Sequence, residues 1–189
     1  MTEYYKLNIL EIQELFDESL LDSETLCQYY LDRIKKYNKH TNSIRCINPD
    51  AIETAMKMDQ ELEDGHKRSL LQGIPILIKD NINTFDKMKT TAGSIALKDF
   101  SASSDAFIVK QLRRAGAVFL GKTNLSEFAN FVTLGAKNGF SALGGQVINP
   151  YDGDLDVGGS SSGSGAAMAT SLAQIAIGTE TSGSILSPS

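Results

Sequence analysis

The sequence predicts an α/β fold in which helices pack on a β-sheet. Two nearly continuous apolar runs, at 74–78 and 117–120, are typical of strands that are buried on both faces. The segment 105–115 between them has the pattern of a helix, so strand, helix and strand follow one another along the chain. A third strand is expected at 174–177, after a long stretch rich in glycine and serine.

The first third of the chain is predicted to be helical. Apolar residues recur at helical spacing in 7–19, 23–36 and 50–64, and Gly65 is expected to end the third helix. A short apolar segment, 44–47, separates the second helix from the third. The exposed faces of these helices are polar, so we expect them to form a scaffold that covers the core.

Composition and charge are those of an ordinary globular protein. The 189 residues are 41% hydrophobic and 22% charged, which excludes wholesale disorder and suits one domain. We expect that domain to consist of an N-terminal helical region, residues 1–70, packed on an α/β core, residues 71–189. A formal net charge of −5 argues against a nucleic-acid binder, which needs a basic face.

The cysteines and the N-terminus favour the cytoplasm. Cys27 and Cys46 are too few for a disulfide scaffold or a four-ligand metal site, which makes a reducing compartment the simpler expectation. No signal peptide or transmembrane run is visible in the sequence, so we expect no membrane partner.

Two motifs suggest ligand sites that their details do not support. Residues 116–123 match the phosphate-loop pattern G-x-x-x-x-G-K-[ST], but their middle part is the predicted strand itself, whereas a true phosphate loop follows its strand. The acidic segment 152–156 resembles a calcium loop, yet Val157 and Gly163 stand where that loop needs glycine and glutamate. We therefore expect neither a nucleotide nor calcium.

The stretch 158–165 contains only glycine and serine, and two interpretations are open. Such a run is the usual composition of a flexible linker. Here, however, a small-residue helix is expected at 166–172, directly after the run, and a strand follows it. A Gly/Ser loop between structured elements is more often a functional site than a tether, and we favour that interpretation.

Any serine chemistry in this chain would need a base other than histidine. His40 and His66 lie in polar, charged stretches, so we expect both to be exposed on the surface. Lys79 directly follows a buried strand; it is either a surface residue whose ammonium reaches solvent or a desolvated base. Desolvation can lower a lysine pKa from about 10.4 towards 7 or 8, which leaves a neutral amine.

Two small-residue segments could complete such a site. The serines at 160–162 lie inside the glycine run, where the backbone can adopt unusual dihedral angles. The segment 178–184 follows a predicted strand and ends in a serine. Its successive small residues could aim several backbone N–H groups at one point, as an oxyanion requires.

Three ordered motifs resemble the amidase signature family. They are residues 73–80 (GIPILIKD), 158–166 (GGSSSGSGA) and 178–185 (GTETSGSI), and residues 121–129 (GKTNLSEFA) also look like a stretch that recurs in those enzymes. Ser184 follows Ser160 by 24 positions, which is the spacing that the family requires. The resemblance covers most of the chain from Gly73 onward.

The resemblance implies a mixed β-sheet covered by helices on both faces, incomplete in this chain, and a Ser–cis-Ser–Lys triad. Ser184 matches the nucleophile, Ser160 the cis-serine bridge and Lys79 the base. Ser161 matches a serine that supports the lysine. The implied oxyanion hole consists of the backbone N–H groups of Thr181, Ser182, Gly183 and Ser184.

The implied activity is hydrolysis of a carboxamide, in a small molecule or a peptide, to a carboxylate and ammonia or an amine. The reaction would proceed through a seryl acyl-enzyme, with no metal or organic cofactor because lysine and serine move the protons. Two alternatives stay open. One is the A subunit of a glutamyl-tRNA amidotransferase, which acts as a glutaminase, and the other is an inactive fragment.

Three positions depart from the commonest family pattern. Glu180, Ser182 and Leu186 stand where aspartate, glycine and arginine are usual, and they favour the bacterial branch that includes peptide amidases. Ser184 lies 5 residues from the end of the sequence, whereas family members continue well beyond this point. We therefore expect the N-terminal part of an amidase, whose missing C-terminal half is its partner in completing the substrate cleft.

Overall fold

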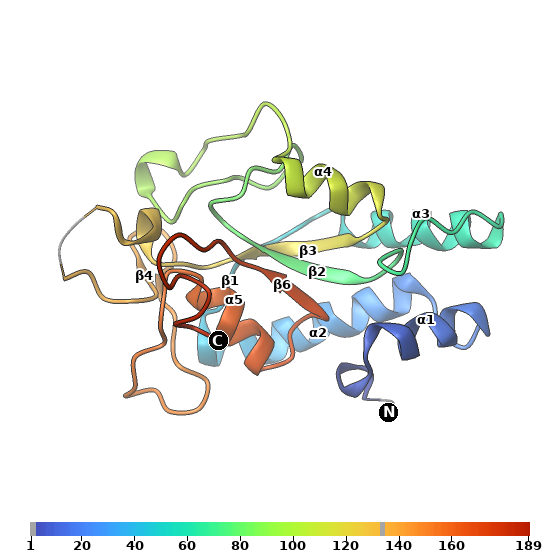
Figure 1. The fold of residues 1–189 in the computed structure, drawn as a ribbon, viewed down its shortest axis with the longest axis horizontal. Coiled ribbons are helices and arrows are strands. Elements are labelled where there is room, and N and C mark those ends of the chain that lie inside the picture. The colour runs from blue at the N-terminus through green and yellow to red at the C-terminus, as the bar shows by residue number, and fades with distance from the viewer. Residues whose placement is uncertain (1–2, 133–134) are drawn as a thin grey trace.

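The computed structural model describes residues 3–132 and 135–189. Its centre is a four-stranded mixed sheet with the strand order β1-β3-β2-β6 (Figure 1). β2 (Pro75–Lys79) pairs in parallel with β3 (Val118–Thr123) on one side and with β6 (Ile175–Ile177) on the other. β1 (Ile44–Ile47) pairs antiparallel with β3. The short apolar segment of the sequence is thus an edge strand, and the expected α/β class with a mixed sheet is confirmed.

Helices lie on both faces of this sheet, which explains the apolar runs. Every residue of β2 and β3 is buried. Figure 1 shows α4 (Phe107–Arg114) on one side of these strands, and α2 (Ser23–Thr41) and α5 (Ser162–Ala169) on the other. The remaining elements are α1 (Ile9–Asp17), α3 (Ala51–Glu63), the short hairpin β4 (Phe140–Ser141) and β5 (Gly145–Gln146), and the 3₁₀ turns η1 (Tyr4–Lys6), η2 (Ile95–Leu97) and η3 (Glu127–Asn130).

Local signals set the ends of the N-terminal helices. The Asn8 side chain accepts hydrogen bonds from the first turn of α1, and Glu11 bonds back to the Asn8 N–H in a capping box. Asp22 caps α2 by accepting from the N–H of Thr25. Gly65 has a φ of +80° and follows α3, where it ends the helix as the sequence predicts. None of the described helices is long and apolar enough to cross a membrane.

α5 begins inside the Gly/Ser run, four residues before the helix expected at 166–172. The reason is the close approach of other backbone segments. A Cβ on Gly163 would lie 2.3 Å from the carbonyl oxygen of Asn124, and one on Gly165 would lie 2.2 Å from that of Pro188. These glycines therefore pack a helix start against its neighbours, and the linker interpretation of the run is wrong.

The pairing of β1 with β3 depends on a glycine in the same way. A Cβ on Gly121 would lie 2.3 Å from the carbonyl oxygen of Cys46. We predict that Gly121→Ala lowers the free energy of unfolding by about 1–3 kcal/mol, because the two strands must separate to admit the methyl group. Gly153→Ala is the control, since its Cβ would lie 3.5 Å from the nearest side chain, and it should change stability by less than about 0.5 kcal/mol. Equal urea midpoints for the two variants would contradict this strand pairing.

Candidate active site

The amine of Lys79 is the centre of a buried cluster of hydroxyl groups. Lys79 is the last residue of β2 and is 0% exposed. Its Nζ donates to Ser160 Oγ at 2.8 Å, to Ser161 Oγ at 3.0 Å and to Thr179 Oγ1 at 2.8 Å. Within the described part of the chain, no carboxylate accepts a hydrogen bond from this amine. Of the two interpretations of Lys79, the desolvated amine is the one that the structure supports.

The two serines reach Lys79 from the loop that leads into α5. The peptide bond between Gly159 and Ser160 is cis, and both serines are buried, Ser160 at 1% and Ser161 at 2% exposure. The Ser160 carbonyl accepts from the N–H of Ser126 at 3.1 Å. A Cβ on Gly159 would lie 2.6 Å from Ser126 Oγ, so glycine is needed for this close approach.

Burial changes the acid–base behaviour of Lys79. Desolvation disfavours the ammonium form and lowers the pKa of Lys79 from its ordinary value to about 8, while the negative charge of Glu180 acts in the opposite direction. The hydroxyl partners carry no charge that would restore the pKa. A substantial fraction of this amine is therefore neutral in mildly alkaline solution.

The backbone of Ser184 is joined to this cluster and to Glu180. The N–H of Ser161 donates to the Ser184 carbonyl at 3.0 Å. The N–H of Ser184 donates to Glu180 Oε1 at 2.8 Å, and Glu180 Oε2 accepts from the N–H of Leu186 at 3.2 Å and from that of Ile185. The Glu180 carboxylate thus caps the turn on which Ser184 lies. Ser184 is half-buried.

The structure brings part of the expected site together. Lys79, Ser160 and Ser161 are in direct contact, whereas Ser184 is tied to them through its carbonyl group. The N–H of Ser184, which the family resemblance assigns to the oxyanion hole, is engaged by Glu180. Of the other three residues assigned there, Thr181 and Ser182 are exposed and Gly183 has a φ of +83°.

Sequence reasoning did not single out two side chains of the cluster. Thr179 Oγ1 accepts from Lys79 and also from Asn81 Nδ2, at 3.1 Å. Asn81 lies just beyond β2 and Thr179 just beyond β6. The sequence holds one signal for this contact, because polar residues that follow neighbouring parallel strands meet at one edge of a sheet. That signal identifies Asn81 and Thr179 only once β6 is known to lie beside β2.

The other sequence candidates lie elsewhere. The strand predicted at 117–120 within the apparent phosphate loop is confirmed, and as β3 it continues to Thr123. Lys122 is buried and donates to the Ile82 carbonyl at 2.6 Å and to Thr90 Oγ1 at 3.0 Å. His40 and His66 are exposed, as expected. In the acidic segment 152–156, the last carboxylate accepts from the N–H of Gly158 and from Asn138 Nδ2.

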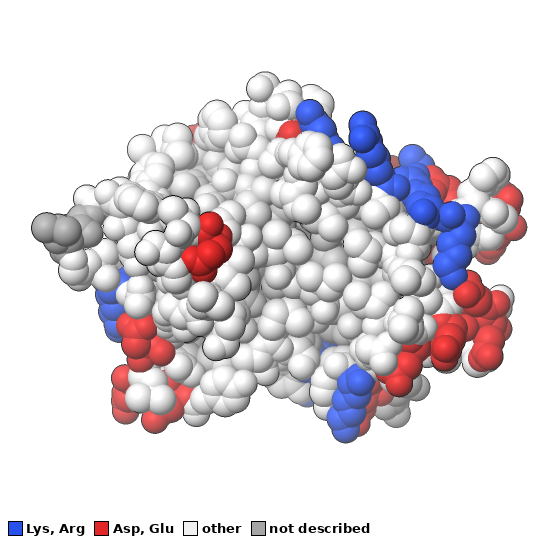
Figure 2. All heavy atoms as spheres, viewed as in Figure 1, with Lys and Arg blue, Asp and Glu red and all other residues white. Residues whose placement is uncertain are grey.

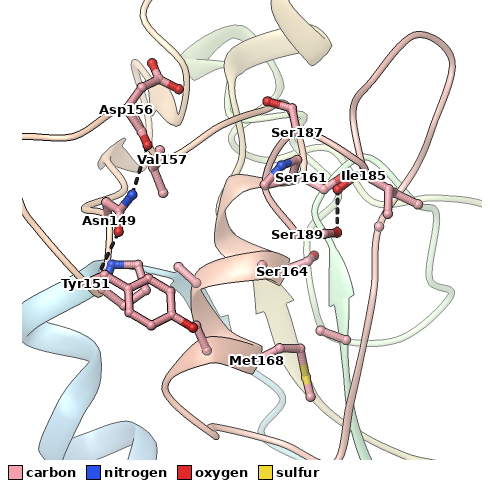
Figure 3. A pocket seen from close by; sticks show the side chains of 17 residues that line it. Asn149, Tyr151, Asp156, Val157, Ser161, Ser164, Met168, Ile185, Ser187 and Ser189 are labelled. Atoms are coloured by element: carbon pink, nitrogen blue, oxygen red, sulfur yellow. Dashed lines mark hydrogen bonds between the residues drawn. The ribbon is translucent and has the colours of Figure 1, made fainter.

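A cavity of about 550 Å³ lies next to the lysine cluster (Figure 3). It is lined by α5, the segment 149–157 and residues 185–189, and Ser161, Ser164 and Met168 line it from the helix side. Ser161 therefore belongs both to the wall of the cavity and to the hydrogen bonds of Lys79.

Comparison with known proteins identifies the family of the chain. The Amidase family model matches residues 25–189. The chain belongs to the amidase family. A Schizosaccharomyces pombe protein named as an amidase is 43% identical over 178 residues, which are 94% of this chain and 30% of that protein. The structure of native peptide amidase from Stenotrophomonas maltophilia matches this amidase chain with a TM-score of 0.94 and 47% identity, over 97% of this chain and 38% of that one.

A third relative represents the amidotransferase branch. The A subunit of the glutamyl-tRNA(Gln) amidotransferase from Chlorobium phaeobacteroides is 40% identical over 168 residues, which are 89% of this amidase chain and 34% of that protein. The chain thus spans between 30% and 38% of the length of these three relatives. The family that the three motifs indicate is confirmed.

We predict that two lysines of this amidase chain titrate far below the ordinary range. Burial lowers the pKa of both Lys79 and Lys122 to about 8. Lysine side-chain carbon-13 resonances should show two midpoints near that pH, one of them lost in Lys79→Met and the other in Lys122→Met. Because the unfolded chain binds more protons between pH about 8 and about 10.4, the contribution of these lysines to stability should rise with pH over that interval. Titration midpoints near about 10.4 for both lysines would contradict the burial of these amines.

Proposed function

We propose that the chain carries the catalytic apparatus of a serine amidase, which hydrolyses a carboxamide to a carboxylate and ammonia or an amine. One observation carries the proposal: the buried amine of Lys79, whose pKa is about 8, is hydrogen-bonded to Ser160 and lacks a carboxylate partner in the described part of the chain. A neutral amine in this position can accept a proton through a hydroxyl group.

The proposed reaction has two halves. The Ser184 oxygen attacks the amide carbonyl carbon, its proton moves to Ser160, and the Ser160 proton moves to neutral Lys79. The C–N bond then breaks while the proton returns through Ser160 to the departing nitrogen, which leaves an ester on Ser184. Water attacks this ester by the same proton route, which releases the carboxylate and restores the serine.

Backbone N–H groups of Thr181, Ser182 and Gly183 are proposed to stabilise the oxyanion. The N–H of Ser184 can join them only when the Glu180 carboxylate releases it, since the two are hydrogen-bonded at 2.8 Å. We assign Glu180 the role of holding the turn, because its carboxylate accepts N–H groups from three successive residues.

A peptide or small-molecule amide is the proposed substrate. The support is the TM-score of 0.94 to a peptide amidase, together with the cavity next to Ser161. The 40% identity to the A subunit of an amidotransferase favours glutaminase activity as a second candidate. Glutaminase activity that rises sharply with a partner protein would establish the second candidate over the first.

One face of the chain suits the remainder of a longer amidase. Figure 2 shows few charged side chains over β6 and the segment after it, while most of the charges lie at the rim. β6 is an edge strand, and in the following segment Leu186 is 79% exposed and Ile185 39% exposed. The part of the relatives that this chain does not span is proposed to cover this face and complete the cleft.

The proposed compartment is the cytoplasm, where the free thiols of Cys27 and Cys46 persist.

We predict that a small fluorophosphonate labels Ser184 once per chain. The label needs only the nucleophile, the proton route and the oxyanion donors, all of which lie within these 189 residues. The labelling rate should rise with pH to a plateau above about 8, where Lys79 is neutral. Lys79→Met should lower the rate by about 10²–10⁴-fold.

Intact mass spectrometry checks this prediction. Ser184→Ala should remove the adduct and Ser187→Ala should keep it, because Ser187 lies three residues further along the same turn. Absence of an adduct on a folded chain, or an adduct that survives Ser184→Ala, would contradict the triad.

We further predict a separation between labelling and turnover. The 189-residue chain, its length confirmed by mass, should react with the fluorophosphonate yet release no measurable ammonia from a C-terminally amidated dipeptide. The reason is that β6 is an edge strand and the apolar side chains of Ile185 and Leu186 are exposed beyond it, so this side of the proposed cleft is uncovered. Turnover by the confirmed 189-residue chain would show that this part of the family fold is sufficient.

A further inference from the structure

Asn81 is connected to the proposed base through a single hydroxyl group. Its Nδ2 lies 3.1 Å from Thr179 Oγ1, which lies 2.8 Å from Lys79 Nζ. Asn81 Oδ1 is buried and has no hydrogen-bond partner among the described residues. Asn81 and Thr179 come together because β2 and β6 are parallel neighbours, with Ile78 opposite Ile177.

The proton count of Lys79 shows why this connection matters. The ammonium form has three N–H groups, and the cluster offers three hydroxyl oxygens, on Ser160, Ser161 and Thr179. The neutral amine has two N–H groups and one lone pair. Ser160 can deliver a proton only if the lone pair faces it, so the N–H groups must point to the other two hydroxyls.

Ser161 is already restricted to accepting from Lys79. Its hydroxyl donates to the Thr179 carbonyl at 3.2 Å, and its oxygen accepts from the N–H of Thr179 at the same distance. The single proton of this hydroxyl is therefore committed to the backbone, and toward the lysine the oxygen is an acceptor.

Asn81 can impose the same restriction on Thr179 by accepting its proton. With Nδ2 toward Thr179, the hydroxyl oxygen accepts from Asn81 and from Lys79, and its own proton has no acceptor among the described residues. With the amide reversed, the Thr179 hydroxyl donates to Oδ1, the oxygen that otherwise has no partner among the described residues. The reversed amide gives the Thr179 proton an acceptor, and in that orientation Asn81 prevents donation from Thr179 to the lysine.

We propose that Asn81 is a positioning residue that acts through Thr179 to direct the lone pair of neutral Lys79 toward Ser160. The proposal rests on the proposed amidase function. Without Asn81, the Thr179 hydroxyl becomes free to donate to the neutral amine. The lone pair of Lys79 then faces Ser160 in only a fraction of the molecules and faces Thr179 in the rest.

The test combines two measurements on the whole chain. The first is the rate of fluorophosphonate labelling at Ser184 as a function of pH, and the second is the carbon-13 titration of Lys79. Asn81→Leu keeps the approximate side-chain volume. In this variant the plateau of the labelling rate at high pH should fall about three- to tenfold, which corresponds to the loss of one hydrogen bond. The pKa of Lys79 should stay at or below its original value, because a donating Thr179 stabilises the neutral amine.

Two further variants separate positioning from a structural role. Asn81→Asp keeps an acceptor for the Thr179 hydroxyl and adds a negative charge, so it should restore the plateau while it raises the pKa of Lys79. In a Thr179→Val background, Asn81→Leu should cause no further loss, because the intermediate hydroxyl is gone. Asn83→Leu, at an exposed position on the same loop, is the matched control and should match the unaltered chain in both measurements.

The possible failures are distinct. If the unaltered chain is not labelled at Ser184, the amidase proposal fails and this inference fails with it. If the unaltered chain is labelled and Asn81→Leu shows the same plateau, the role of Asn81 is disproved while the amidase proposal stands. If Asn81→Leu instead raises the pKa of Lys79 toward about 10.4, water has entered a loosened cluster, and a structural role replaces the positioning role.

Discussion

The site depends on the burial of the Lys79 amine, which has no carboxylate partner among residues 3–132 and 135–189. A charge removed from water is costly unless it is paired, and three neutral hydroxyls compensate only in part. The next residue, Asp80, is a fully buried carboxylate, but Arg45 pairs with it at 2.5 Å and Thr91 donates to it. Arg45 takes up that negative charge, while burial lowers the pKa of the neighbouring Lys79. Two adjacent residues therefore have different partners: Asp80 is in an ion pair with Arg45, and Lys79 is hydrogen-bonded to neutral hydroxyls.

Placing three hydroxyls around one amine requires close packing of distant segments. The loop before α5 can reach Lys79 because glycines let α5 approach the backbone of Asn124 and of Pro188. The other end of α5 is held from α2, where the Arg33 guanidinium donates to the Ser171 carbonyl at 2.8 Å and lies 4.3 Å from the ring centre of Tyr5. Arg33 satisfies backbone carbonyls just after the helix end and adds a positive charge where the helix dipole favours one. The N-terminal helices therefore support the site without contributing a residue to it.

Much of this arrangement was predictable from the sequence, and the exceptions share a physical cause. The strands near 74–78 and 117–120 were predicted because burial on both faces leaves an unbroken apolar run. The meeting of Lys79 with Ser160 was implied by three ordered motifs, whose spacing reflects the fold. The strand at 44–47, the early start of α5 and the contact of Asn81 with Thr179 were missed. Each of these depends on a partner far away in the chain, so no local pattern of residues reports it.

The second buried lysine shows that a lowered pKa alone does not distinguish the proposed base. Burial lowers the pKa of Lys122 to about 8, as it does for Lys79. Lys122, however, donates to the carbonyl oxygen of Ile82, which holds no proton to transfer, and to Thr90 Oγ1. The three partners of Lys79 are hydroxyls, and that of Ser160 is proposed to receive one proton while it gives up another. The two amines therefore differ in the groups that surround them, and the hydroxyls around Lys79 come from two segments that the fold brings to one edge of the sheet.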